Sequence, residues 1–197
     1  MLENFKKYIL SKSEISEKEF DQLAKHLKQK KVKKGELLLR QGEVCIYSFF
    51  VSTGLLRSYT IDESGKEHII QFAPEDWLIV DRSSSFFNLP SELNIDAIEN
   101  SEVVFLSLDF IENASALNSS CISFNNKSLH SHILHLQKRV NLLLGATAEQ
   151  RYLDFIALYP SLTLRIPQWM IASYLGITPE SLSRVRKELA KRNFRPH

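Results

Sequence analysis

The sequence is poor in cysteine, with only Cys45 and Cys121 among 197 residues. Their separation fits no metal-binding or redox motif, and so few thiols are typical of a reducing compartment. No segment approaches the roughly 18 uninterrupted apolar residues that a membrane span requires. The first ten residues lack the apolar stretch of a secretion signal, and no nucleophile–base pair or paired carboxylates stand out. We therefore expect a soluble cytoplasmic protein that is not an enzyme.

Charge is distributed unevenly along the chain. The net charge is +2, but residues 1–150 hold 17 Lys and Arg against 20 Asp and Glu. Residues 151–197 hold eight basic residues against three acidic ones. A basic end on a slightly acidic body is what binding to a phosphate backbone would use. A solvated charged tail would give the same counts.

The first half of the chain indicates a helix followed by short strands. Ser16 and Glu19 have the spacing of a capping box, and apolar residues then recur at helical intervals. After a basic run the pattern changes to short β segments separated by turn residues, at 36–40, 46–51, 55–61, 67–72, 93–98 and 103–108. Short strands at such intervals predict a small antiparallel barrel or sandwich.

Residues 111–144 predict one long helix after an irregular start. Its apolar residues alternate in steps of four and three, as in a coiled-coil seam, and the seam extends backward through a polar position: Ile122, Asn126, Leu129, Ile133, Leu136, Val140 and Leu143. An Asn in such a seam can set register and oligomeric state. We interpret the seam as a parallel homodimer interface. A core helix packed on the barrel is the alternative, and Gly145 would cap the helix in either case.

The clearest pattern lies at residues 166–190 and predicts a helix-turn-helix. Ala172 supplies a small residue where two helices touch, and Gly176 allows the positive φ of the turn. Thr178 is a candidate N-cap, and Pro179 suits the first helical position. The inward positions are apolar: Ile171, Leu175, Ile177, Leu182, Val185 and Leu189.

The outward face of the second helix has the chemistry of a DNA reader. Arg184 can donate two hydrogen bonds to guanine, Glu180 can accept from cytosine, and Ser183 can contact thymine or phosphate. A further set is expected at the DNA backbone: Thr178, Ser181, Arg186, Lys187, Lys191 and Arg192. An ordinary helical hairpin with a solvated face is the alternative.

The motifs together resemble the family of the cyclic-AMP receptor protein and the fumarate–nitrate reduction regulator, from about residue 16 to 194. The resemblance rests on Lys34-Gly-Glu-Leu-Leu, Arg40-Gln-Gly-Glu, Phe50-Val-Ser-Thr-Gly54, Leu55-Leu-Arg-Ser-Tyr59 and Tyr174-Leu-Gly-Ile-Thr-Pro-Glu-Ser-Leu-Ser-Arg184. It implies an α+β fold with an antiparallel β-roll (double-stranded β-helix), a long dimer helix and a winged helix-turn-helix. It also implies a homodimer that binds palindromic operators under the control of an effector in the β-roll.

The sequence departs from this family at the effector site. Nucleotide-binding members have a Gly-Glu pair where Ile79-Val80 stand, and an Arg-Ser or Arg-Thr pair near Ser91-Glu92. The Glu92 carboxylate would repel a cyclic phosphate. Arg82 and Ser83 are candidates for a substitute anion site, with a plain surface loop as the alternative. The cysteine cluster of the oxygen-sensing branch is absent.

The C-terminal end is the second departure, because only Arg192-Asn-Phe-Arg-Pro-His197 follows the second helix. We expect the wing to be truncated or absent. His130, His132 and His135 cluster on the long helix, and His132 and His135, one turn apart, could bind a metal or form a pH-sensitive patch. All three are expected to be plain surface residues. Trp77, Phe86 and Phe87 are expected in the core, with an effector pocket as the alternative.

The predicted organisation is a sensor β-roll over 1–110, a dimerisation helix over 111–146 and a DNA-binding domain over 147–197. The predicted function is a homodimeric transcriptional regulator that binds double-stranded DNA without control by a cyclic nucleotide. RNA polymerase is a further candidate partner, no cofactor or metal is expected, and the effector is unknown. The alternatives are an anion or metabolite sensor with a vestigial DNA-binding head, and an interaction scaffold.

Overall fold

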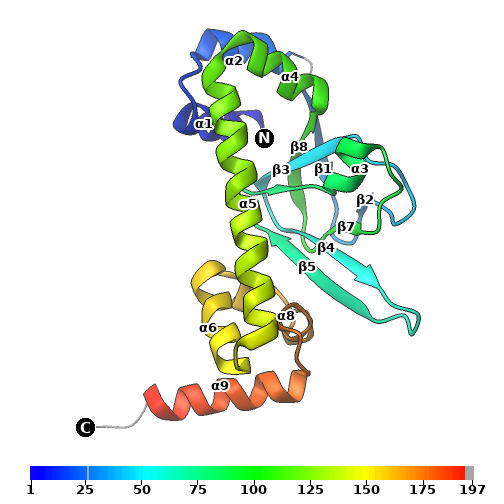
Figure 1. The fold of residues 1–197 in the computed structure, drawn as a ribbon, viewed down its shortest axis with the longest axis vertical. Helices are drawn as coiled ribbons and strands as arrows, with labels where there is room; N and C mark the ends of the chain where they lie inside the picture. The colour runs from blue at the N-terminus through cyan, green and yellow to red at the C-terminus, as the bar shows by residue number, and fades with distance from the viewer. Residues whose placement is uncertain (26, 194–197) are drawn as a thin grey trace. The chain divides into compact units, whose positions relative to one another are not determined.

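The computed structural model describes residues 1–25 and 27–193 and forms two compact units (Figure 1). Unit 1 comprises Met1–Lys66 and Ile70–His130, and unit 2 comprises Glu67–Ile69 and the chain from Ser131 onward. The helices are α1 (Leu2–Lys12), α2 (Glu17–Ala24), α3 (Arg82–Phe87), α4 (Leu108–Leu117), α5 (Ser119–Gly145), α6 (Ala148–Leu158), α7 (Leu162–Arg165), α8 (Gln168–Leu175) and α9 (Pro179–Asn193). The strands are β1 (Lys28–Val32), β2 (Leu37–Leu39), β3 (Tyr47–Thr53), β4 (Leu56–Ile61), β5 (Glu67–Ala73), β6 (Leu78–Ile79), β7 (Asn94–Ala97) and β8 (Ser101–Ser107).

Two four-stranded sheets form the body of unit 1, in the orders β1-β8-β3-β6 and β2-β7-β4-β5. The pairings of β1, β3 and β6 in the first sheet and of β7 in the second are antiparallel. Phe49 and Phe105 from the first sheet share a buried cluster with Leu56 and Ile95 from the second. Alternate residues of each strand therefore meet between the sheets, as strand periodicity requires. The predicted antiparallel β-roll and the α+β class are confirmed.

The connection between β3 and β4 depends on Gly54. Its φ is +93°, and a Cβ atom there would lie 2.3 Å from the Ser101 side-chain oxygen and 2.7 Å from its Cα. The next amide, that of Leu55, donates to the same Ser101 hydroxyl at 3.1 Å. Only glycine fits this close approach between the turn and the start of β8.

The N-terminal helices cover one side of the first sheet. Phe5 of α1 and Phe20 of α2 are buried with Phe50 and Val104, which face away from the inter-sheet core. The predicted capping box of α2 is confirmed, because the Ser16 hydroxyl accepts from the Glu19 amide and the Glu19 carboxylate accepts from the Ser16 amide. The sequence did not predict α1, α3, α7, β1 or β6.

The long helix expected over 111–144 is α5, and the irregular start expected for it is a break between two helices. Asn118 is extended, with φ −147° and ψ 120°, and separates α4 from α5. Its side-chain oxygen accepts from the Ser120 amide at 3.0 Å, which satisfies a free donor at the start of α5. The chain leaves α5 after Gly145 without the positive φ of a glycine cap, so the predicted cap is wrong.

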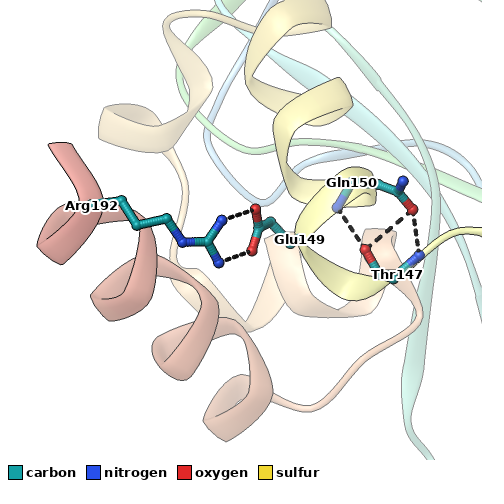
Figure 2. A network of polar contacts seen from close by, with 4 residues as sticks. All are labelled: Thr147, Glu149, Gln150 and Arg192. Atoms are coloured by element: carbon teal, nitrogen blue, oxygen red, sulfur yellow. Dashed lines mark hydrogen bonds and ion pairs between the residues drawn. The ribbon is translucent and has the colours of Figure 1, made fainter.

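Unit 2 contains a small helical core. Tyr152 and Phe155 of α6 are buried together with residues of α8 and α9. The inward positions predicted for the helix-turn-helix are buried as well, except for Ile177 and Leu189, which are half-buried. Thr147 caps α6 through a capping box with Gln150 (Figure 2). Among the described residues, no helix is long and apolar enough to cross a membrane.

Candidate nucleic-acid interface

The turn between α8 and α9 has the geometry that the sequence predicts. Gly176 adopts φ 64° and ψ 37°, and its amide donates to the Ser173 carbonyl at 3.1 Å. A Cβ at this position would lie 3.1 Å from a Leu143 methyl group, so glycine is favoured by space as well as by φ. Arg151 secures the end of α8, because its guanidinium donates to the Leu175 carbonyl at 2.8 Å. The first helix of the motif is thus fixed at its C-terminal end.

Thr178 begins α9, as predicted. Its side-chain oxygen accepts from the Ser181 amide at 3.2 Å, and Pro179 occupies the first helical position, which has no N–H to satisfy. Thr178 also donates to the Ser181 hydroxyl at 3.2 Å. Both residues were predicted at the DNA backbone. They are placed at the N-terminus of α9, where the helix dipole favours an anion.

The predicted base-reading residues share the exposed face of α9. Glu180, Ser183 and Arg184 are exposed, whereas Leu182 and Val185 on the opposite face are buried at 0% and 8% exposure. Hydrogen bonds from the Glu180 amide and from Thr178 lower the pKa of the Glu180 carboxyl. Glu180 is therefore an ionised acceptor beside the Arg184 donor near the start of the helix.

The residues predicted to contact the DNA backbone differ in their exposure and in their hydrogen bonds within the protein. Lys187 and Lys191 are exposed, and Arg186 is half-buried. Arg192 instead forms two 2.7 Å hydrogen bonds with the Glu149 carboxylate in the first turn of α6 (Figure 2). These bonds and the charge of Glu149 raise the pKa of Arg192. Nothing in the sequence indicated this pair, because its members lie 43 positions apart.

The predicted dimer seam is exposed along α5. Ile122, Ile133, Leu136 and Val140 keep 46%, 42%, 43% and 52% of their surface exposed. Leu143 is 38% exposed, Asn126 is exposed and Leu129 is half-buried. A core helix packed on the barrel would have buried these residues. The seam is therefore an apolar stripe that no other part of the described chain covers fully.

At the expected effector site, a carboxylate of the protein itself takes the position that an anionic ligand would need. Asp81 is 5% exposed and accepts from the Ser83 and Ser84 amides at the start of α3, at 3.0 and 3.2 Å. The Ser91 hydroxyl donates to its other oxygen at 2.6 Å.

Ser83, a candidate anion ligand with Arg82, donates its hydroxyl to Asp81 at 2.7 Å. A carboxylate therefore lies where the substitute anion would have to bind, and this argues against the candidate site. Arg82 is exposed at the first position of α3, a short helix where the sequence alternative had a loop.

The aromatic residues beyond this segment correct another prediction. Phe86 and Phe87 were expected in the core, but they are 70% and 67% exposed and stack edge-to-face at 5.2 Å. Trp77 is half-buried against the inter-sheet core. His130 and His135 are exposed and His132 is half-buried. In the part of the chain that the structure describes, no group of three or more His, Cys, Asp or Glu could hold a metal ion.

The prediction that the wing is truncated or absent falls partly on residues outside those that the structure describes. Up to Asn193 no strand follows α9, and residues 194–197, on which part of the prediction falls, are not described. The exposed basic helix, the capped turn before it and the β-roll define a class of protein with a β-roll domain followed by a helix-turn-helix.

Comparisons with known proteins agree with this class. Residues 29–118 match the family described as the cyclic nucleotide-binding domain. The anaerobic regulatory protein of Pasteurella multocida is 26% identical over 190 residues, which cover 90% of this chain and 68% of that protein. The fumarate and nitrate reduction regulatory protein of Yersinia pestis is 27% identical over 192 residues, covering 91% and 76%.

Solved structures extend the likeness to the fold. FixK2 from Bradyrhizobium japonicum superposes with a TM-score of 0.73 at 20% identity, covering 87% of this chain and 88% of that one. A transcriptional regulator of the Crp/Fnr family from Eubacterium rectale gives a TM-score of 0.68 at 16% identity, with 94% and 88% covered. In sequence and in fold the chain is thus similar to regulatory proteins of the Crp/Fnr family.

Proposed function

We propose that this protein is a transcriptional regulator that binds a palindromic DNA operator as a homodimer in the cytoplasm and is not controlled by a cyclic nucleotide. The observation that carries the proposal is the exposed face of α9, where Glu180, Ser183 and Arg184 lie opposite the buried Leu182 and Val185. A helix presented in this way can enter the major groove, where its N-terminal residues reach base edges.

The chemistry of this face supports sequence-specific reading. Arg184 can donate two hydrogen bonds to guanine O6 and N7, and the ionised Glu180 can accept from cytosine N4. Lys187, Lys191 and the amides at the start of α9 supply contacts to phosphate. The hydrogen bonds between Arg192 and Glu149 hold α9 against α6. Because its guanidinium is engaged there, Arg192 is the least suited of the predicted residues to contact the DNA backbone.

The exposed seam of α5 supports the homodimer. Five apolar residues of the seam are 38–52% exposed, and the last four of them, from Ile133 to Leu143, follow one another in steps of three, four and three. A second copy of α5 is the surface that fits such a stripe. A two-fold dimer places two copies of α9 so that each reads one half-site. RNA polymerase is a further candidate partner, and the division 1–110, 111–146 and 147–197 is the organisation we propose.

The proposed independence from cyclic nucleotides rests on Asp81. Its carboxylate uses the amides at the start of α3 and the Ser91 hydroxyl, so a cyclic phosphate would have to displace a buried anion. Titration with cyclic AMP and cyclic GMP, followed by calorimetry, should give no binding heat at millimolar nucleotide. Saturable binding of either nucleotide would refute this part of the proposal.

Selection of bound fragments from random double-stranded DNA tests the regulator itself. We expect a palindrome whose half-sites are centred about 34 Å apart, one helical turn. Failure of the full-length protein to retain any DNA at low salt would refute the proposal. Binding of a metabolite in the absence of any DNA binding would instead favour a sensor with a vestigial head.

Two variants of α9 separate base reading from backbone binding. Arg184→Ala should lose about 1–3 kcal/mol at one base pair of each half-site and relax the preference there. Lys187→Ala should weaken binding evenly across sequences and reduce the salt slope by about one. Filter binding to the selected operator and to its single-base variants measures both effects. If both variants lost the same binding free energy on every DNA sequence, Arg184 would not be a base-reading residue.

A further inference from the structure

The joint between α5 and α6, residues 143–151, is short. Only Ala146 and Thr147 separate the end of α5 at Gly145 from the start of α6 at Ala148. The part of α5 from Ser131 onward belongs to unit 2 together with α6, α8 and α9, so the joint lies within one compact unit. Each linker residue has two soft backbone dihedrals, so the angle between α5 and the helices after it depends on contacts across the joint.

Arg151 of α6 binds the linker and the end of α8 at once. Its Nε donates to the Ala146 carbonyl at 3.1 Å, and its Nη1 donates to the Leu175 carbonyl at 2.8 Å. Both carbonyls lie at helix C-termini, where the helix dipole favours a positive charge. The guanidinium is planar and holds its donors in fixed directions, so the two bonds together fix the end of α8 relative to the end of α5.

Arg139 makes a second contact, from α5 itself. Its guanidinium carbon lies 3.7 Å from the centre of the Tyr174 ring of α8, and its Nη2 donates to the Ile69 carbonyl at 2.9 Å. The Tyr174 ring packs in turn on the rings of Phe155 and Tyr159, with centroids 5.5 and 5.8 Å apart. Arg139 therefore stacks α5 on the aromatic cluster of the helix-turn-helix domain.

The joint is continuous with the seam proposed for the dimer. Leu143 is the last residue of that seam, and one of its methyl groups would lie 3.1 Å from a Cβ atom at Gly176, in the turn before α9. In the proposed dimer, the angle at the joint therefore determines where each α9 lies relative to the two-fold axis.

A small rotation at the joint is enough to change the spacing of the two reading helices. Arg184 lies six positions after Thr178, which is about 9 Å along α9. A rotation of roughly 10° displaces Arg184 by about 1.5 Å, and two-fold symmetry doubles the change between half-sites to about 3 Å. The rise of one base pair is about 3.4 Å.

We propose that Arg151 and Arg139 are positioning residues that hold the helix-turn-helix at one angle on α5 and thereby set the half-site spacing that the dimer accepts. The inference rests on the proposed function and deepens it. The residues of α9 select the bases, and the two arginines select the distance between the half-sites without contacting DNA.

Filter binding to operators of altered spacing tests this role. The selected palindrome is compared with versions in which one base pair is inserted or removed at its centre. The native protein should bind these versions at least about tenfold more weakly, because one α9 then misses its half-site. Arg151→Met should reduce this difference at least threefold, and the addition of Arg139→Met should remove it. A base change within a half-site should weaken binding of the variants by the same factor as that of the native protein.

Lys138→Gln provides the matched control. Lys138 of α5 pairs with Asp154 of α6 across the same joint, but its side chain is 59% exposed, and an exposed ion pair contributes little. This variant should keep the native spacing preference. Arg151→Lys keeps the charge and loses the planar fork, so its preference should lie between those of the native protein and Arg151→Met.

The outcomes separate this inference from the function on which it rests. An Arg151→Met protein that keeps the full spacing preference, or that loses the same affinity on every operator, would overturn the positioning role. A Lys138→Gln protein that loses the preference would also overturn it, because any contact across the joint would then suffice. If the methionine variants do not fold, an unchanged preference in Arg151→Lys would overturn it. A native protein that selects no palindrome would instead refute the proposed function before any variant is made.

Discussion

Replacement of Asp81 by alanine should destabilise the β-roll measurably. Asp81 caps α3, and loss of an Asp cap costs about 0.5–2 kcal/mol. The buried Ser91 hydroxyl also loses a charged partner, a contact worth about 1.5–3 kcal/mol. Part of that loss is recovered, because the Leu93 carbonyl lies 2.9 Å from the same hydroxyl and can accept its proton. We therefore expect a net loss of about 2–3 kcal/mol in the free energy of unfolding.

This loss should depend on pH in a defined direction. Burial raises the pKa of Asp81, but hydrogen bonds from Ser91, Ser83 and the Ser84 amide outweigh it and leave the pKa below its ordinary value. A carboxyl with a lowered folded-state pKa stabilises the fold fully above its unfolded value of about 3.9. The stabilisation disappears as pH falls through the lower folded-state pKa. The gap between native protein and variant should thus be constant from pH 6 to 8 and shrink in acid.

Thermal unfolding followed by circular dichroism measures the effect. For a chain of this length 1 kcal/mol shifts Tm by roughly 2–4 °C, so Asp81→Ala should lower Tm by about 4–12 °C at pH 7. Asp81→Asn should lose less, because Asn is also a good N-cap. Asp109→Ala, at an exposed position in the first turn of α4, is the control. A shift no larger than that of the control, or a gap that widens in acid, would refute the reasoning.

Three further predictions concern other contacts. Arg57→Met should lower the free energy of unfolding by about 3–5 kcal/mol, because it leaves the buried Asp96 carboxylate without the partner that binds it at 2.7 and 3.0 Å. Asp96→Leu in the same chain should recover most of this loss, and urea unfolding that shows no recovery would contradict the prediction. Val140→Glu should shift the protein from dimer to monomer in sedimentation equilibrium, and an unchanged mass would remove the seam from the interface. Arg192→Glu should weaken operator binding in filter assays, and Glu149→Arg in the same chain should restore the affinity. If the affinity were not restored, Arg192 would act by contacting DNA directly and not through Glu149.

The helix-turn-helix could be predicted from the sequence because its determinants are local. The positive φ of Gly176 and the cap of Thr178 depend on residues within four positions, and the apolar spacing of α9 follows directly from helix periodicity. The capping box of α2 was predictable for the same reason. Short-range rules are sufficient where hydrogen bonds close within one turn.

The missed elements depend on contacts that are distant in sequence. β1 is a lysine-rich segment with little strand propensity, and it is a strand because β8 pairs with it. α3 has six residues, too few for an apolar period, and its stability comes from Asp81. Phe86 and Phe87 resemble core residues by type, but the short helix directs them outward. Asn118 breaks the long helix through a cap that competes with helix continuation.

The exposed seam of α5 has a consequence for how the protein responds to its own abundance. In the proposed dimer, a narrow stripe with a polar Asn126 near one end would give an association of limited strength, so that monomer and dimer would coexist at low concentration. In the proposed regulator only the dimer reads both half-sites, and its amount rises with the square of the monomer concentration. Operator occupancy would then change more steeply than protein level, which turns a modest change in synthesis into a sharper change in the genes it controls.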